Sequence, residues 1–501
     1  SARPYPLDVS AWIVPGISRM VTDMLDNLGL RTDFGEILPE AGGVVRRFRP
    51  VLPRPTLRTL TAPARVLPRV RRFDAAMWSA DPRFACFRRE VDELAATDLR
   101  TLGWAELVRL PRRALAATRL LTALRVDYFP RVGVTLLLLR LLLKALRLSE
   151  LFAMLTAGAP TRTSDTNCAL EDLAARVRAD AFLRQAFADM TPSELLENIT
   201  ADPRFDDFAT AFRGFVAEYG HRETTSPLLV SEPTWADAPA TVLGIVSLLA
   251  EQPPETGRRN EPAMAMRRLL RHRLVRATRS RHPVEHLVAA ARAGVAMRED
   301  THFHLTEAIP LLRHVALECG RRLADAGVLS DADDVWHLRL EELENIGEPV
   351  TLSAADAERL RRAVAERTAR RAELVGVPMI TAVELAAPSR QQPDPDALVH
   401  GTGASGGRAT GPARVISGPE RFSALRPGDV LVCPYTNPAW TPLFQRAAAV
   451  VVDSGGLASH AAIVAREYGI PAVMGTVRGT SVLTDAQRVT VDGDRGSVSA
   501  A

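Results

Sequence analysis

The stretch Val450 to Thr476, with the sequence VVVDSGGLASHAAIVAREYGIPAVMGT, constrains the fold more than any other part of the chain. Its opening, Val450 to Val452, is β-branched and is typical of a buried strand. Gly455 and Gly456 supply a turn free of Cβ restriction, and the residues that follow predict a helix that ends at Gly469 before a second apolar strand. The stretch therefore predicts a strand, a helix and a returning strand.

His460 is predicted to lie at or beside the N-terminus of that helix. Unpaired N–H groups and the positive end of the helix dipole favour an anion there, so a phosphoryl group carried on the imidazole would be stabilised where it forms. Ser459 is expected to cap the helix or contact that group, and Gly455 and Gly456 are expected to border it. A histidine that begins a helix is, taken alone, more often structural than catalytic.

The periodicity of the sequence changes once along the chain. The 501 residues are enough for two or three domains. Residues 1–387 have mainly helical patterns, whereas residues 403–501 contain short apolar runs typical of strands. Residues 388–402 between them are polar and rich in proline, which is typical of a linker. We therefore predict a mainly α-helical region, a linker and a compact C-terminal domain with β-strands.

Several long helices are predicted in the first region. Asp98–Arg125 and Val134–Leu148 are read as two helices separated by Pro130 and Gly133, and Leu170–Met190 as another. The phenylalanines at helical spacing between positions 205 and 215 form an apolar stripe, which we assign to the core rather than to a cofactor site because amphipathic helices routinely bury such stripes.

Charge and cysteine content argue against several classes of function. A formal net charge of +4 is too small to indicate nucleic-acid binding. The four cysteines lack CxxC spacing, which argues against a zinc ribbon or a disulfide framework and fits a reducing cytoplasm. The histidine pairs 282/286 and 302/304 lack the partner spacing of a recognisable metal site, so no metal is predicted.

The most apolar run of the chain, Val134–Leu148, is shorter than a membrane span and is interrupted by Arg140 and Lys144. No secretory signal is visible in the opening residues. We therefore expect a cytoplasmic protein without a membrane partner.

Three segments of the C-terminal part carry a resemblance to a known family: CPYTNPAWTPLF (Cys433–Phe444), GGLASHAAIVAREYGIPAV (Gly455–Val473) and VTVDGDRGSV (Val489–Val498). They resemble the swivelling phosphohistidine domain of the phosphoenolpyruvate-utilising enzymes. Among these enzymes, the motifs of rifampicin phosphotransferase are the most similar in sequence. The resemblance implies a β/β/α swivelling domain at residues 403–501. It also implies that His460 accepts a phosphoryl group at one active site and delivers it at another.

The helical region carries shorter resemblances to rifampicin phosphotransferase-like proteins. The segment EYGHR, which contains His221 and Arg222, is followed by a Pro and Trp segment as in their central domain. The resemblance implies that both residues contact substrate. From the residues alone, the segment is equally a C-terminal helix cap.

Arg298, Glu299 and His302 match an Arg-Glu-x-x-Lys run that faces the incoming phosphohistidine in related antibiotic phosphotransferases. His302 replaces the lysine, so a fixed cation becomes a group that can act as acid or base. Helical spacing places the three residues close together, where Arg298 would clamp an anionic group and Glu299 would take a proton from a substrate hydroxyl. A surface ion pair is the structural alternative.

The sequence shows no pattern of the domains that phosphorylate the histidine in this family. The sequence contains no GxxxxGK[ST] loop and no pattern of a phosphoenolpyruvate-binding barrel, and its sole lysine, Lys144, lies in an apolar helix. No cofactor is therefore expected on this chain alone. ATP and Mg²⁺ are expected through an ATP-grasp partner, which is a separate protein in trans or an absent part of the same chain.

Two enzymatic functions and one non-catalytic role remain open. The first is a phosphotransferase or subunit that relays a phosphoryl group through His460 to a hydroxyl of a small molecule, by resemblance an antibiotic or secondary metabolite. The second is a repurposed scaffold that acts as a dehydratase or another lyase or isomerase, with His460, Glu299 and His302 as general acid and base. The third is a docking or carrier protein. The intact helix start favours the first, because proton transfer alone does not require an anion site.

Overall fold

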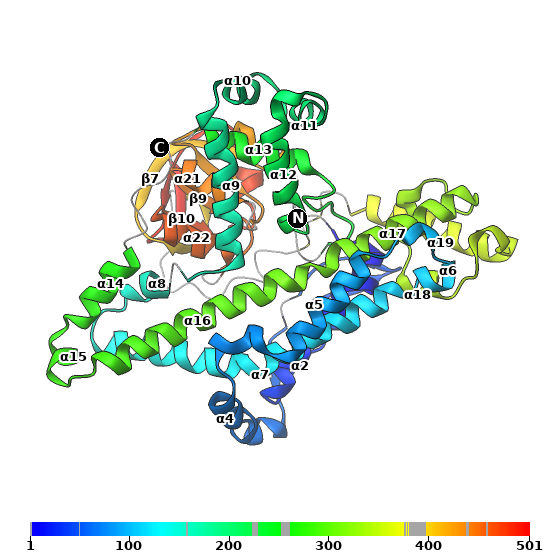
Figure 1. Cartoon of the computed structure of the whole chain (residues 1–501). Helices are drawn as coiled ribbons and strands as arrows, with labels where there is room; N and C mark the ends of the chain where they lie inside the picture. The colour runs from blue at the N-terminus through cyan, green and yellow to red at the C-terminus, as the bar shows by residue number, and fades with distance from the viewer. Residues whose placement is uncertain are drawn as a thin grey trace.

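The computed structural model describes residues 3–49, 51–156, 159–222, 229–251, 261–374, 377, 379, 397–436, 440–456 and 459–501. A mainly helical region is followed by a C-terminal domain built on an eight-stranded sheet (Figure 1). This confirms the predicted fold class. None of the helices in these ranges combines the length and apolar content that a membrane crossing requires.

Residues 3–80 form short elements. They comprise α1 (Pro6–Asp8), a π-helical segment (Val9–Ser18), α2 (Arg19–Asn27), α3 (Phe34–Ile37), α4 (Ala62–Arg72), the paired strands β1 (Leu30–Arg31) and β4 (Arg54–Pro55), and the paired strands β2 (Glu40–Ala41) and β3 (Val44–Val45). The buried carboxylate of Asp8 accepts hydrogen bonds of 2.8 Å from both the backbone N–H and the hydroxyl of Ser231. These bonds fix the start of the chain to a segment more than 200 residues away.

Long helices form the body of the helical region. They are α5 (Pro82–Ala95), α7 (Leu110–Ala145), α16 (Arg281–Thr306) and α17 (Ala308–Asp325), with α6 (Trp104–Leu107), α18 (Leu340–Glu344) and α19 (Ala354–Ala372) beside α17. Helices α7 and α16 lie side by side across the molecule (Figure 1). Leu124, Tyr128 and Val132 of α7 share one buried cluster with Met297 of α16, so α7 helps to fix the position of α16.

The prediction of two helices around Pro130 is wrong, because α7 continues through Pro130 as one helix of 36 residues. A proline inside a helix removes a backbone hydrogen bond and costs about 3 kcal/mol. Leu124 and Tyr128 precede the proline and Val132 follows it, and all three are buried. Burial of apolar side chains on both sides of Pro130, at roughly 1.5–3 kcal/mol each, offsets the local cost.

A second group of helices lies along one side of the C-terminal domain. It comprises α8 (Leu151–Thr156), α9 (Arg162–Ala179), α10 (Ala181–Asp189), α11 (Pro192–Ala201), α12 (Asp206–Tyr219) and α13 (Pro239–Ala250), while α14 (Glu261–Leu270) and α15 (Arg273–Ala277) lead into α16. The predicted single helix Leu170–Met190 is divided at Asp180. Its carboxylate accepts hydrogen bonds from Phe182 N (2.7 Å) and Leu183 N (3.1 Å), so it caps a new helix instead of continuing the old one.

The C-terminal domain is built on a mixed sheet. Its strands, in spatial order, are β5 (Ala397–His400), β12 (Ser497–Ala500), β11 (Arg488–Asp492), β7 (Arg408–Val415), β8 (Val430–Cys433), β9 (Ala449–Val452), β10 (Ala472–Met474) and β6 (Thr402–Ser405). The four strands from β7 to β10 are parallel, and the pairs on either side of them are antiparallel. The predicted strand, helix and returning strand are β9, α22 (His460–Tyr468) and β10.

The sheet begins inside the segment predicted as a linker. Residues 397–402 of the predicted linker 388–402 include β5 and the first residue of β6, and residues 388–396 lie outside the described residues. Val399 pairs with Val498 of β12 and is 4% exposed, so the sheet gains an apolar contact by including this strand.

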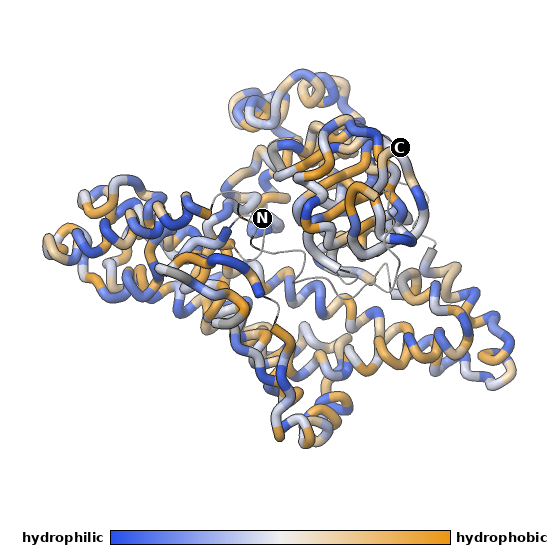
Figure 2. Tube along the Cα trace, turned by 180° about the vertical axis from the view of Figure 1, so that it is seen from behind, coloured by the Kyte–Doolittle hydropathy of each residue, from blue (hydrophilic) through white to orange (hydrophobic). Residues whose placement is uncertain are grey.

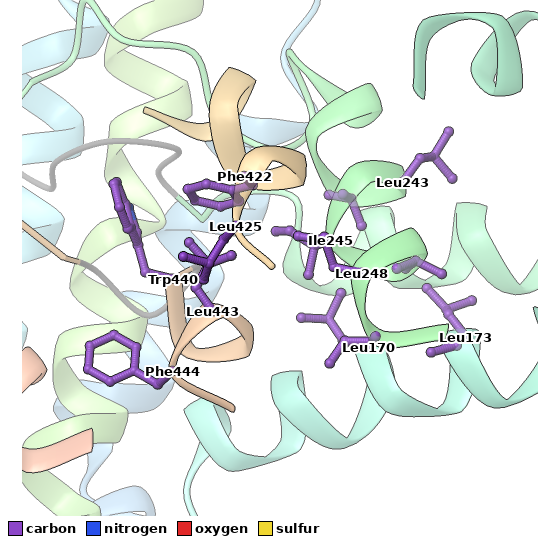
Figure 3. Packing of buried hydrophobic residues seen from close by; sticks show 14 of the residues in the cluster. Leu170, Leu173, Leu243, Ile245, Leu248, Phe422, Leu425, Trp440, Leu443 and Phe444 are labelled. Atoms are coloured by element: carbon purple, nitrogen blue, oxygen red, sulfur yellow. The ribbon is translucent and has the colours of Figure 1, made fainter. Parts of the chain in front are cut away.

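Apolar residues are concentrated in the sheet of this domain (Figure 2). One face of the sheet forms a buried cluster inside the domain, with Val482 of α23 (Gly479–Val482) packed against it; this cluster includes Val430, Val451 and Val489. The other face belongs to a larger buried cluster that extends into α9 and α13. Figure 3 shows the side chains that meet there: Phe422, Leu425, Trp440, Leu443 and Phe444 from the C-terminal domain, and Leu170, Leu173, Leu243, Ile245 and Leu248 from the helices.

One ion pair crosses the same interface. Arg446 Nη2 donates to Glu251 Oε2 at 2.9 Å, and the Arg446 side chain is 6% exposed. Its Nε and Nη1 atoms are buried without a hydrogen-bond partner among the described residues. The C-terminal domain is therefore docked on α9 and α13 mainly by apolar packing.

Candidate functional site

The start of α22 lies after the carboxyl end of the parallel strand β9. His460 is the first residue of the helix and Ser459 is its N-cap. Ser459 Oγ accepts a hydrogen bond from Ala462 N at 3.3 Å, and Ser459 N donates to Gly456 O at 2.9 Å. The structure thus places the histidine where the sequence predicts it, one residue past a serine cap.

Gly455 gives the turn before this helix its shape. Its φ is +94°, a conformation that side-chain-bearing residues rarely adopt. A Cβ at Gly455 would lie 2.9 Å from Ser459 Cβ, whereas a Cβ at Gly456 would meet no atom within 4 Å. Gly455 is therefore required by the turn, and Gly456 leaves open space beside the helix start.

Neighbouring loops hold the turn in place. Thr476 Oγ1 donates to Asp453 Oδ1 at 2.8 Å, and Thr480 donates to Asp453 Oδ2. Ser454 Oγ donates to Pro434 O at 2.8 Å, which links the ends of β9 and β8. These bonds rigidify the segment that leads to α22.

Backbone groups give this helix start its chemistry. The N–H groups of His460 and Ala461 are in the first turn and have no partner within the helix. The side chain of His460, together with residues 457 and 458, lies outside the described residues. The first-turn N–H groups and the positive end of the helix dipole are suited to bind an anion.

The YGHR segment is held by backbone pairing to the segment that follows it. Trp235 N donates to Arg222 O at 2.9 Å, and Ala236 N donates to Gly220 O at 2.8 Å. A Cβ at Gly220 would lie 2.2 Å from Val216 O, so only glycine fits this close approach. The segment is therefore more than a helix end, because it fixes the direction of the next two side chains.

His221 and Arg222 both contact Phe303 of α16. The His221 ring lies edge-on to Phe303 with centroids 4.5 Å apart, and the Arg222 guanidinium is 5.4 Å from the same ring centroid. Burial lowers the pKa of His221 to about 3, and the positive charges of Arg222 and His304 act in the same direction. His221 Nε2 is buried without a hydrogen-bond partner among the described residues, so His221 is a neutral imidazole at pH 7.

Arg298 and Glu299 form an ion pair at the surface of α16. Arg298 Nη2 lies 2.9 Å from Glu299 Oε1, and the two side chains are 50% and 29% exposed. The buried Arg125 donates to Arg298 O at 3.3 Å and to Thr301 Oγ1 at 3.0 Å, which holds this turn of the helix. His302, four residues after Arg298, is partly buried. The structure therefore places the three predicted residues on neighbouring positions of one helix.

A second group on α16 was missed by sequence reasoning. His304 Nδ1 lies 2.9 Å from Glu307 Oε1, and both Glu307 oxygens accept from Arg88 Nη1 of α5 at 2.7 Å. Asp300 accepts a hydrogen bond of 2.7 Å from the backbone N–H of Arg162, the first residue of α9, and burial raises the pKa of Asp300. The i,i+3 spacing of His304 and Glu307 was a signal for this pair, but the partners on α5 and α9 are distant in sequence.

The structure joins His221 and Arg222 to this second group rather than to the Arg298–Glu299 pair. Phe303 is the shared contact, since its ring meets His221, Arg222 and His304. The ring centroids of Phe303 and His304 are 5.4 Å apart.

Within the described ranges, no group of three or more His, Cys, Asp or Glu side chains is arranged to hold a metal ion.

Comparison with known proteins identifies two parts of the chain. Residues 425–496 match the mobile domain of PEP-utilising enzymes, and residues 129–299 match the fourth domain of rifampicin phosphotransferase. The matched ranges include both His460 and the pair Arg298 and Glu299.

Relatives cover most of the chain. It is 30% identical over 361 residues to the "Uncharacterized phosphotransferase YvkC" of Bacillus subtilis, a match that covers 70% of this chain and 43% of the relative. It is 27% identical over 358 residues to a rifampicin phosphotransferase of Streptomyces sviceus, covering 69% of this chain and 40% of the relative. A probable phosphoenolpyruvate synthase of Archaeoglobus fulgidus is 50% identical over 101 residues, covering 20% of this chain and 13% of the relative.

The chain thus spans less than half the length of each of these relatives. The C-terminal domain thus matches the mobile domain of PEP-utilising enzymes, and part of the helical region matches the fourth domain of rifampicin phosphotransferase.

Proposed function

We propose that this chain relays a phosphoryl group through His460 to a hydroxyl of a small molecule held by the helical region. The imidazole carries the phosphoryl group covalently between the donor and the acceptor. This divides one difficult displacement into two easier ones. The rifampicin phosphotransferase relatives support an antibiotic or a related secondary metabolite as the acceptor.

The start of α22 is the observation that carries this proposal. A serine-capped helix, preceded by a glycine with a positive φ, presents backbone N–H groups that have no partner within the helix at the position of His460. Such a helix start stabilises the negative charge of a phosphoryl group, while a histidine that only transfers protons has no need of it.

On the acceptor side, Arg298 is proposed to hold the transferred group. Its guanidinium is half exposed and is already oriented by Glu299, so an incoming phosphoryl group can take the place of the carboxylate. His302, one turn further along α16, is proposed to exchange a proton there. His221 and Arg222 are proposed to contact the acceptor molecule from the YGHR segment.

The phosphoryl donor is proposed to be ATP with Mg²⁺, bound by an ATP-grasp protein or by a further part of the same protein. The relatives are more than twice as long as their matched parts, which leaves room for such a domain in them. The docked position of the C-terminal domain on α9 and α13 would then be one of at least two positions that it occupies.

Chemical phosphorylation of His460, called loading below, tests the proposal without the ATP-grasp partner. The wild-type chain and His460→Ala are incubated with phosphoramidate, a small donor that phosphorylates imidazoles, and acid-labile phosphate is located by peptide mapping. We expect His460 to load faster than His282, which is on α16 and has a side chain that is 86% exposed. Loading of His460 no faster than that of His282 would reject the proposal and favour the acid–base lyase, which the histidine at position 302 supports.

A further inference from the structure

We propose that His304 is the general base of the acceptor site, and that the acceptor hydroxyl is carried by an aromatic or similarly flat apolar molecule. This inference rests on the proposed function and deepens it. It assigns removal of the hydroxyl proton to His304 rather than to Glu299 or His302, and it makes Glu307 and Arg88 positioning residues.

The tautomer of His304 follows from its partner. Glu307 Oε1 lies 2.9 Å from His304 Nδ1, and a carboxylate only accepts hydrogen bonds. Nδ1 therefore carries the proton of the neutral ring, and Nε2 presents its lone pair. Nε2 makes no hydrogen bond to any residue in the described ranges. This is the arrangement of an oriented base awaiting a proton.

Glu307 is held in the form that orients the histidine. Arg88 Nη1 donates to both of its oxygens at 2.7 Å, and the Glu307 side chain is 10% exposed. The guanidinium and the carboxylate form a short ion pair at this distance. Arg88 comes from α5, so the chain of contacts from Arg88 to Glu307 to His304 joins two helices and fixes the ring relative to both.

Aromatic rings surround the imidazole. The ring centroid of His304 lies 4.8 Å from that of Phe84, 5.4 Å from that of Phe303 and 6.1 Å from that of Trp78. The His304 side chain is 12% exposed, so it is enclosed but not sealed. Aromatic rings favour a flat apolar ligand, and low exposure to water strengthens the interaction of a base with a hydroxyl.

Glu299 is a poorer base than His304 in this structure. Its carboxylate is engaged by Arg298 at 2.9 Å, so it is less available to accept a hydrogen bond from a substrate hydroxyl. His304 has a ring nitrogen that makes no hydrogen bond within the described ranges, and histidine is the side chain that most often acts as a general base. It also shares Phe303 with His221, whose role in substrate contact the sequence predicts.

The transfer step is balanced by these groups. The acceptor oxygen attacks the phosphorus on His460, forming an O–P bond while the N–P bond breaks. The electron pair of the N–P bond returns to the His460 imidazole. The hydroxyl proton passes to His304 Nε2, and the resulting imidazolium is stabilised by Glu307.

The test separates loading from transfer. Wild-type protein, His304→Gln, Glu299→Gln and Glu307→Gln are loaded with phosphoramidate, freed of the reagent and mixed with a high concentration of benzyl alcohol as the probe. Benzyl phosphate and remaining phosphohistidine are followed by ³¹P NMR. His282→Gln, a change on an exposed part of the same helix, is the control for replacing a histidine.

We expect all variants to load His460, and His304→Gln to form benzyl phosphate on the order of 100-fold more slowly than the wild type. His282→Gln should stay within about threefold, which is far below the effect of a lost base, and a loss in Glu299→Gln as large as that expected for His304→Gln, with His304→Gln unaffected, would show that Glu299 is the base instead. For Glu307→Gln, ¹⁵N NMR should show that the Nδ1–H form of His304 is no longer favoured, a change that a purely structural ion pair would not produce.

Other outcomes reject the inference in distinguishable ways. Normal loading with unchanged transfer by His304→Gln overturns the role of His304 and leaves the proposed function intact. A loaded wild-type protein that forms no benzyl phosphate also overturns it, because the inference requires the acceptor site to take an aromatic alcohol. Failure of His460 to load removes the proposed function itself.

Discussion

The start of α22 and the second group on α16 are both proposed to act in phosphoryl transfer, but they are built from different parts of the chain. At α22 the chemistry comes from backbone N–H groups, a serine cap and a glycine with positive φ. On α16 it comes from side chains, where Arg88, Glu307 and His304 form a chain of contacts between two helices.

This difference determines what each region tolerates. A site made of backbone groups depends on the path of the main chain, so it is damaged by any residue that changes that path. A site made of side chains depends on each functional group and on the burial that sets its charge. The following predictions test the two kinds of dependence, from the largest expected effect to the smallest.

His460→Ala should abolish phosphoryl transfer and leave the fold unchanged. The imidazole is proposed to carry the covalent intermediate, while alanine is well accepted in a helix. The stability change should be within about 0.5 kcal/mol. Denaturant unfolding and benzyl phosphate formation measure the two quantities, and full transfer by the variant would contradict the role of His460.

Gly455→Ala should damage the backbone site, whereas Gly456→Ala should not. An alanine at Gly455 is forced to a φ near +94° and its Cβ meets Ser459 Cβ at 2.9 Å. The strain should cost on the order of 1–3 kcal/mol and slow loading of His460. A Cβ at Gly456 meets nothing within 4 Å, so this neighbour is the matched control. Equal loading rates in the two variants would show that the turn does not shape the site.

His221→Gln should make the protein less sensitive to acid. The pKa of His221 falls from 6.5 to about 3 on folding, mainly through burial. Between these pH values the unfolded state binds more protons, so stability rises with pH and is lost as pH falls, by up to about 1.4 kcal/mol per pH unit. The raised pKa of Asp300 acts in the opposite direction and is retained in the variant.

Urea unfolding at a series of pH values checks the prediction for His221. We expect the slope of stability against pH between 3 and 6.5 to be smaller in His221→Gln than in the wild type. His282→Gln provides the exposed-histidine control. The same slope in all three proteins would contradict a buried neutral His221.

Ser459→Ala should produce the smallest effect. It removes the side-chain acceptor of Ala462 N, a cap typically worth about 1 kcal/mol, but keeps the path of the backbone. Loading of His460 should fall only a few-fold, whereas Ser459→Asp should restore helix stability and repel the phosphoryl group. Thermal unfolding and loading rates separate the two. A loss as large as that of His460→Ala would show that the hydroxyl has a direct chemical role.

Local sequence determined much of the C-terminal domain. The β-branched run before Gly455 and the glycine after the helix predict β9, α22 and β10, because strand, turn and cap preferences act over a few neighbouring residues. The same local signals place His460 at the first position of the helix, with Ser459 as its cap. The change from helical to strand periodicity also predicts the order of the two regions.

Local sequence failed where distant residues compete with local preference. Pro130 predicts a break, yet α7 continues because Tyr128 and Val132 on either side of it are buried in the cluster that includes Met297 of α16. Likewise, β5 forms within a stretch that reads as a linker, because Val399 finds its partner in β12 at the other end of the domain.

Only the tertiary structure decided which residues of the helical region form a group. The sequence pointed to Arg298, Glu299 and His302, which are close in sequence, and to His221 and Arg222 separately. The fold joins the latter two to Phe303 and His304, and it brings Arg88 to Glu307 across 219 positions. The physical reason is that the charge state and orientation of a buried side chain are set by its neighbours in space, and those neighbours come from helices that no local pattern can pair.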